Sequence, residues 1–216
     1  MRFRLLLIVI GALFAAAAWT FPYWQPLLPV GGAAAELFPG LDPELQGAFA
    51  ALPPERQEAY HALADEDSAH ALEMLTAALT RGSPAPANDQ EMPEMIGSSM
   101  VAVGAFGQID VMRYAEGEVS IYQDASGGGL LRFEDFSVVN GPDLRVVLSA
   151  SAAPREPEEM RAGGLDYEVG ELRGVTGNQN YTIPPEVDLQ QYASVVIYSA
   201  ELDMIYSSAE LFASRS

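Results

Sequence analysis

The chain has 216 residues, with 30 acidic residues against 11 basic ones and a formal net charge of -19. It contains no cysteine and every basic residue is arginine, which excludes disulfides, thiolate nucleophiles, thiolate metal sites and lysine Schiff bases. Because nucleic-acid binding depends on clustered basic side chains, we expect no nucleic acid among the partners.

Residues 1–30 have the pattern of a membrane anchor. Arg2 and Arg4 precede an apolar run, and the first acidic residue is Glu36. A helix over residues 5–24 reaches roughly 20 residues, enough to cross a bilayer. We therefore predict a single-pass cell-membrane protein with a cytoplasmic N-terminus and a periplasmic or extracellular C-terminal domain. A signal peptide cleaved after the run of alanines is the alternative.

Residues 31–81 have a helical pattern and are predicted to form a spacer. Asp42 and Pro43 are typical of a helix start, and Asp65 or Asp67 is expected to cap the last helix. The predicted helices are Glu44 to Leu52, Glu55 to Ala64, and a third that ends near Arg81. We expect these short helices to pack on each other, on the membrane or on the next domain. The segment 82–99 that follows is rich in Pro, Ala and polar residues, and is predicted to be a flexible linker.

In residues 100–213 the sequence pattern differs from that of the preceding helices and consists of short β-type runs separated by turn residues. The predicted strands are Val101 to Phe106, Gly117 to Gln123, Leu130 to Phe133, Leu144 to Ser149, Tyr167 to Leu172 and Ser194 to Glu201. Turn signals occur at Ser126 to Gly129 (SGGG), at Asn140 to Asp143 (NGPD) and at Gly177-Asn178 (GN). The fold class is therefore mainly β, an antiparallel β-sandwich or barrel at the C-terminus, preceded by a transmembrane helix and a short α-helical segment.

Motifs of this β region closely resemble the DM-thirteen domain from about Met100 to Phe212. In chain order they are Gly104-Ala105-Phe106, Ala115 to Val119 (AEGEV), Leu131 to Phe136 (LRFEDF), Asn140 to Leu144 (NGPDL), Leu172 to Tyr181 (LRGVTGNQNY) and Val195 to Tyr198 (VVIY). The resemblance implies an extracytoplasmic β domain with a role in electron transfer. It also implies that a signature cysteine belongs at the position of Ser199, where it would act as a redox-active thiol or anchor a group such as haem. A serine hydroxyl neither oxidises reversibly nor ligates haem iron as a thiolate does.

Several residues are candidates for a site. Ser199 is expected to be buried in a strand, and a soft, aromatic-lined pocket could form around Met204, Tyr198 and Tyr206. The turns are expected to be mainly structural, with a possible role in lining a ligand site. The ligand-lining candidates are Asn140, Asp143, Asn178, Gln179, Asn180, Tyr181, Tyr198 and Met204.

Catalytic and metal residues are not predicted. His61 and His70 are expected to be surface residues, because neither lies near a nucleophile motif and their spacing does not place them together on a helix. No cofactor is predicted, although haem remains open, as does calcium at carboxylates such as Glu134, Asp135, Asp143, Asp188, Glu201 and Asp203.

Two functions follow for this membrane-anchored domain. The first is a non-catalytic binding or interaction module for an extracytoplasmic protein or glycan. The alternative is a component of an extracytoplasmic electron-transfer system that uses a non-thiol cofactor or a cofactor-bearing redox partner.

Overall fold

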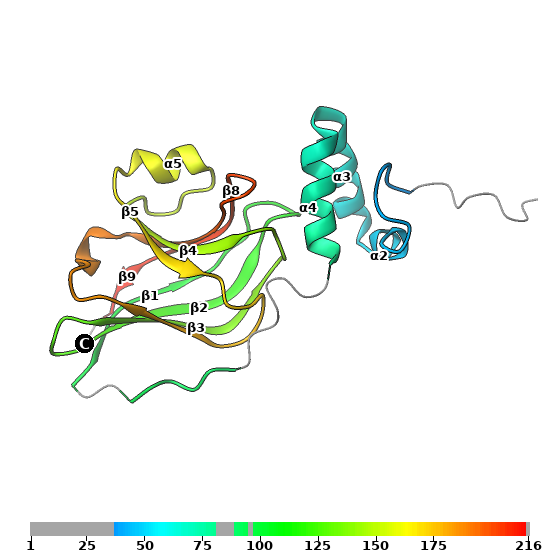
Figure 1. Ribbon diagram of the computed structural model, residues 1–216. Coiled ribbons are helices and arrows are strands. Elements are labelled where there is room, and N and C mark those ends of the chain that lie inside the picture. Colours follow the sequence, from blue (N-terminus) through cyan, green and yellow to red (C-terminus); the bar gives the residue numbers. More distant parts are fainter. Residues whose placement is uncertain (1–36, 81–88, 95–96, 215–216) are drawn as a thin grey trace, which may run out of the picture. The chain divides into compact units, whose positions relative to one another are not determined.

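The computed structural model describes residues 37–80, 89–94 and 97–214 (Figure 1). The chain divides into two compact units, Met1–Pro39 and Gly40–Ser216. The predicted anchor over residues 5–24 lies outside the described residues. Among those that are described, no helix is long and apolar enough to span a bilayer.

The second unit begins with three helices, α2 (Gln46–Ala50), α3 (Pro54–Glu66) and α4 (Ser68–Leu79). A proline at the first position opens α3, and the side chain of Asp67 caps α4 by accepting hydrogen bonds from the amides of Ala69 and His70. The cap predicted at Asp65 or Asp67 is therefore at Asp67. The first predicted helix is shorter than expected, because its opening residues form turns.

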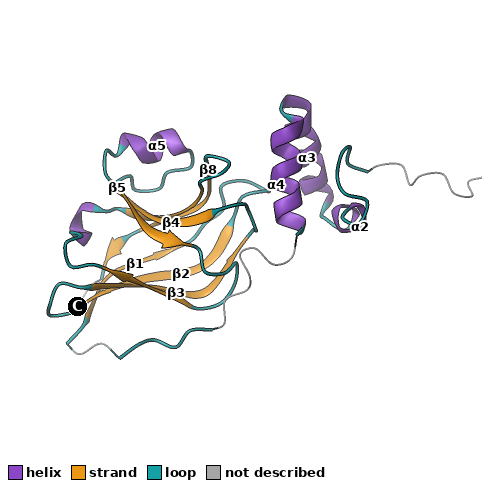
Figure 2. Ribbon diagram, viewed as in Figure 1, coloured by secondary structure: helices purple, strands orange, loops and turns teal. Residues whose placement is uncertain are grey.

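Two antiparallel sheets form a sandwich, which confirms the predicted β class (Figure 2). The five-stranded sheet has the order β6-β3-β2-β1-β9 and the four-stranded sheet the order β5-β4-β7-β8. The strands are β1 (Ser99–Ala105), β2 (Ala115–Gln123), β3 (Gly129–Val138), β4 (Leu144–Ser149), β5 (Asp166–Glu171), β6 (Gln179–Ile183), β7 (Ser194–Ser199), β8 (Met204–Glu210) and β9 (Phe212–Ala213).

The core between the sheets contains an aromatic cluster. Phe106, Phe133, Phe136 and Tyr181 have ring centroids 4.9 to 5.4 Å apart, and all four are buried. Such pairs add to the free energy gained by burying the rings themselves. This core holds the strands, and therefore the turns between them, in fixed positions.

A second, smaller apolar cluster involves β4, β7 and β8. Val147, Val196 and Ile205 pack there with Ile109 and Met160. Met160 belongs to α5 (Pro157–Ala162), a helix that the sequence reasoning did not predict. Its signals were present, since a proline opens it, acids fill the first turn and Arg161 lies in the last.

The α3 and α4 helices pack on each other and also contact the sandwich. The Arg56 guanidinium lies over the ring of Tyr114, 4.7 Å from its centroid, and donates to the Tyr114 hydroxyl. Tyr60 of α3 is 1% exposed, and burial raises its pKa. The expectation that these helices pack on each other and on the following domain is confirmed.

Candidate functional site

The NGPD turn, which joins β3 to β4, connects the sandwich to α4. The side-chain amide of Asn140 donates hydrogen bonds to the carbonyl oxygens of Ala77 (2.9 Å) and Thr80 (3.1 Å). Ala77 lies in the last turn of α4 and Thr80 is its C-cap residue, where the helix cannot satisfy the carbonyl groups itself. Asn140 therefore acts as a C-terminal cap supplied from a distant part of the chain.

Gly141 in this turn is required because a side chain there would not fit. Its backbone is not left-handed; that conformation occurs at Asp143, with φ of 42°. Instead, a Cβ at position 141 would lie 2.4 Å from the ring of Tyr206. Tyr206 is fully buried, and its hydroxyl has no hydrogen-bond partner among the described residues.

Ser199 lies at the end of β7, and the predicted burial within a strand is confirmed, since the residue is 0% exposed. Its hydroxyl donates to the carbonyl oxygen of Pro142 (2.6 Å) and accepts from the amide of Leu202 (3.2 Å). Both hydrogen bonds go to backbone, and the oxygen is not open to a ligand. A buried hydroxyl with this arrangement does not fit the attachment of haem or of another prosthetic group.

A groove of about 570 Å³ lies beside this turn, between one face of α4 and two β turns. The wall is mostly apolar. Five α4 residues at helical spacing and the C-cap residue face it, opposite the NGPD turn and Glu201 of the β7–β8 turn: Ala69, Leu72, Glu73, Thr76, Ala77 and Thr80. Asn140 and Asp143, two of the predicted ligand-lining residues, are part of the lining.

Carboxylates give the groove its charge. The carboxyl groups of Glu73 and Glu201 share a hydrogen bond, which raises the pKa of Glu201 above its ordinary value. Partial loss of hydration and the negative charges of Glu73 and Asp143 act in the same direction. Two exposed carboxyl groups held this close repel one another when both are ionised, so a bound cation would relieve that repulsion.

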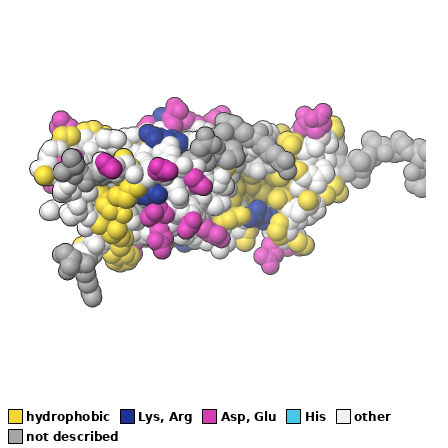
Figure 3. Space-filling view, turned by 90° about the horizontal axis from the view of Figure 1, so that it is seen from below, with side chains coloured by type: hydrophobic (Ala, Val, Ile, Leu, Met, Phe, Trp, Pro, Cys, Tyr) yellow, Lys and Arg dark blue, Asp and Glu magenta, His cyan; other side chains and the backbone are white. Residues whose placement is uncertain are grey.

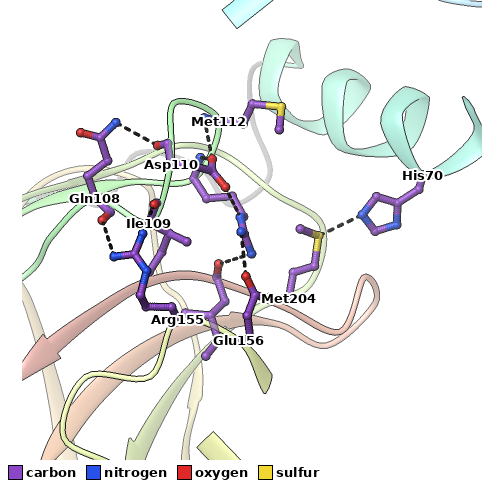
Figure 4. Close-up of polar contacts among 10 residues, drawn as sticks. His70, Gln108, Ile109, Asp110, Met112, Arg155, Glu156 and Met204 are labelled. Carbon is purple, nitrogen blue, oxygen red and sulfur yellow. Dashed lines mark hydrogen bonds and ion pairs between the residues drawn. The ribbon is translucent and has the colours of Figure 1, made fainter. Parts of the chain in front are cut away.

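Met204 contacts a histidine that the sequence reasoning had placed on the surface. The Nε2 atom of His70, in the first turn of α4, lies 2.9 Å from the Sδ atom of Met204 at the start of β8 (Figure 4). Both side chains are half-buried. The two tyrosines considered for a pocket around Met204 make other contacts: Tyr206 packs against Gly141, and the Tyr198 hydroxyl donates to Asp203.

Tyr198 lies with charged residues outside the groove. Its hydroxyl donates to Asp203 (2.6 Å), and Arg161 of α5 also pairs with Asp203. These two contacts lower the pKa of Asp203, with the hydrogen bond from Tyr198 as the largest cause. Tyr198 therefore helps to attach α5 to the β7–β8 turn.

The GNQNY residues hold another part of the chain. Gln179 donates to the carbonyl of Gly174 (2.7 Å) and accepts from the Tyr181 hydroxyl (2.7 Å), and both residues are buried. Asn178 and Asn180 bind residues 89–91: the backbone oxygen of Asn178 accepts from Gln90, and Asn180 contacts Gln90 and Glu91. The motif was expected to be a turn, yet Gln179, Asn180 and Tyr181 belong to β6, and only the left-handed Gly177 (φ 94°) turns the chain.

The carboxylates considered for calcium make contacts other than a shared metal site. Asp143 pairs with Arg145, Glu134 with Arg132, and Asp188 caps a short 3-10 helix, Leu189–Gln191. Within residues 37–80, 89–94 and 97–214, no group of three or more His, Asp or Glu side chains is placed to hold a metal ion. On the face in Figure 3, acidic side chains are scattered over the surface and arginines form small separate spots.

Sequence reasoning missed the α4 side of the groove. Glu201 had been considered only among the carboxylates for calcium, and no role in a site was predicted for Leu72 or Glu73. The available signal was that α4 carries apolar residues on two faces: Ala71, Met74 and Leu75 are buried, whereas Leu72 faces the groove.

These features define an antiparallel β-sandwich domain with an attached helical pair. The family model described as "Electron transfer DM13" matches residues 110–211. The resemblance identified from the motifs is therefore confirmed.

Solved structures show weaker likeness. Two variants of superoxide dismutase 5 from Candida albicans are similar, at 14% and 12% identity and TM-scores of 0.40 and 0.37. The matches cover 55% and 57% of this chain, and 94% and 95% of the other chains. No curated protein matches the chain.

Proposed function

We propose that the protein is a non-catalytic binding module, anchored through residues 5–24 and exposed on the outer face of the membrane. Its binding site is the groove between α4 and the NGPD and β7–β8 turns. The occupant is a segment of an extracytoplasmic partner that presents an amine or guanidinium group next to apolar side chains.

The observation that carries this proposal is the Glu73–Glu201 carboxyl pair at an apolar groove. Leu72 and Ala69 offer a surface to aliphatic groups. A cationic side chain would replace the shared proton and gain charge-assisted hydrogen bonds. The acidic surface of the whole chain would speed the approach of such a partner.

The test uses the full chain and a short fluorescein-labelled peptide of alternating leucine and lysine. Its affinity is measured by fluorescence anisotropy for the wild type and for the Glu73→Gln/Glu201→Gln double variant. We expect the double variant to bind about tenfold more weakly, a loss of about 1.4 kcal/mol. A peptide in which glutamate replaces lysine should not bind.

Matched controls remove the same charges elsewhere. Glu58→Gln on α3 and Glu158→Gln on α5 alter exposed acids that do not line the groove, and each should leave the affinity within about twofold, because screening weakens distant charges. Equal affinity for the wild type and the double variant, or equal loss in the controls, would rule out the groove as the site.

Electron transfer is the second candidate function. It is favoured by the family description and by the soft donor pair of His70 and Met204. Ser199 would take no part, because its hydroxyl is buried and bonded to backbone. Visible spectroscopy and redox titration of the full chain, with and without added haem, test it. A Soret band of stoichiometric intensity or a reversible couple would displace the binding-module proposal.

A further inference from the structure

The contact between His70 and Met204 joins two donor atoms that soft metal ions prefer. The imidazole Nε2 and the thioether Sδ face each other at 2.9 Å, from α4 and from β8 (Figure 4). Imidazole nitrogen suits copper and zinc, whereas an uncharged thioether selects Cu(I). We propose that this pair binds a single Cu(I) ion, and the proposal does not depend on either function proposed above.

The position of His70 supports a singly charged ion. Its backbone amide donates to the Asp67 carboxylate (3.0 Å), so the residue is fixed in the capped first turn of α4. The positive end of the helix dipole disfavours added positive charge there. A monovalent cation therefore suits the site better than a divalent one. The carboxylates of Asp67 and Glu73 on the same helix provide a negative field that favours a cation.

The donors also distinguish the site from hard-metal and zinc sites. Calcium and magnesium take oxygen ligands, and structural zinc takes four ligands drawn from Cys, His and carboxylates. The described residues hold no group of three such side chains. A site of one imidazole nitrogen and one thioether sulfur matches the low coordination numbers of Cu(I).

Binding requires a small movement that both side chains permit. Metal–nitrogen and metal–sulfur bonds of roughly 2.0 and 2.3 Å would place the donors farther apart than they are now. Met204 is unbranched, so its sulfur can withdraw by rotation about its side-chain bonds. The His70 nitrogen must present a lone pair, and the remaining ring proton then lies on Nδ1.

The experiment titrates the full chain with Cu(I) under anaerobic conditions against a colorimetric Cu(I) chelator. We expect one equivalent to be held. Met204→Leu conserves side-chain volume and should weaken Cu(I) affinity by at least about tenfold, as should His70→Ala. Met100→Leu, at an exposed position on β1, is the matched control and should not change it.

A second readout does not depend on the folding of a variant. Addition of one equivalent of Ag(I), a spectroscopically simple substitute for Cu(I), should shift the NMR signals of the Met204 methyl group and the His70 ring in the wild-type chain. The proposal is overturned if those signals do not move. It is also overturned if the chelator removes all the copper, or if Met204→Leu holds copper as tightly as the wild type.

Discussion

The hydroxyl of Ser199 donates a hydrogen bond of 2.6 Å to the carbonyl oxygen of Pro142. This bond joins the end of β7 to the NGPD turn, where the family resemblance had placed a signature cysteine. The same hydroxyl accepts from the amide of Leu202 and so stabilises the β7–β8 turn as well. Serine is therefore a structural residue at this position.

Ser199→Ala should destabilise the protein by about 1–3 kcal/mol, because it leaves the part-buried carbonyl of Pro142 and the buried amide of Leu202 without their partner. Thermal unfolding followed by circular dichroism measures the loss. Ser199→Cys should lose less, and its thiol should react with an aromatic disulfide reagent only as the protein unfolds, since a buried thiol has a raised pKa. Rapid labelling of the native variant would contradict the burial.

Tyr206 and Tyr181 form a matched pair for testing hydrogen bonds. The Tyr181 hydroxyl donates to Gln179 and accepts from the amide of Arg173, whereas the Tyr206 hydroxyl is unpartnered among the described residues. Tyr181→Phe should therefore cost about 1–2 kcal/mol, while Tyr206→Phe should be neutral or slightly stabilising. Urea unfolding of both variants decides the matter. An equal loss in both would mean that Tyr206 has a partner.

These two tyrosines and Tyr60 should make the folded protein less stable at alkaline pH. Burial raises the pKa of Tyr181 to about 12 and also raises those of Tyr60 and Tyr206. Each native tyrosine stays protonated while the unfolded one ionises near pH 10, so its contribution to stability is complete below about pH 10 and is lost as the pH rises. For Tyr181 alone the slope is about 1.4 kcal/mol per pH unit between pH 10 and 12. Unfolding curves across this range should show a smaller slope for Tyr181→Phe.

The affinity of the groove for a cationic peptide should fall at acid pH. The pKa of Glu201 is raised by its hydrogen bond to Glu73, so the pair releases its shared proton at a higher pH than an ordinary carboxyl group. A cationic peptide binds the deprotonated pair, and its affinity should therefore rise with pH, with a midpoint above the usual glutamate value of about 4.3. Glu201→Gln should remove this dependence. A flat profile in the wild type would separate binding from the carboxyl pair.

The strands were predictable where alternation and turns agreed. Leu144 to Ser149 forms β4 with the predicted bounds, and each of the other five predicted ranges overlaps a strand. By contrast, β6 was interpreted as part of a turn, because Gly177 and Asn178 were expected to supply a left-handed backbone. In the structure the amides of β6 bond within the chain and to residues 89–91, and only tertiary contacts reveal this.

The groove was not predictable, because its two sides are distant in sequence. Glu73 and Glu201 meet across α4 and the β7–β8 turn, and no local pattern places them together. His70 was assigned to the surface because it lies near no nucleophile motif and its spacing from His61 does not place the two together on a helix. What fixes it against Met204 is the packing of α4 on the sandwich, including the cap that Asn140 provides for that helix.

The hydrogen bonds between residues 89–91 and β6 also affect solubility. β6 is an edge strand, and an edge with unpaired amides and carbonyls can recruit the strand of another molecule. Gln90 already accepts from the backbone amide of Asn180 and donates to the carbonyl of Asn178. This short segment thus acts as an edge protector, and a chain shortened to begin after it would be prone to self-association through the exposed strand.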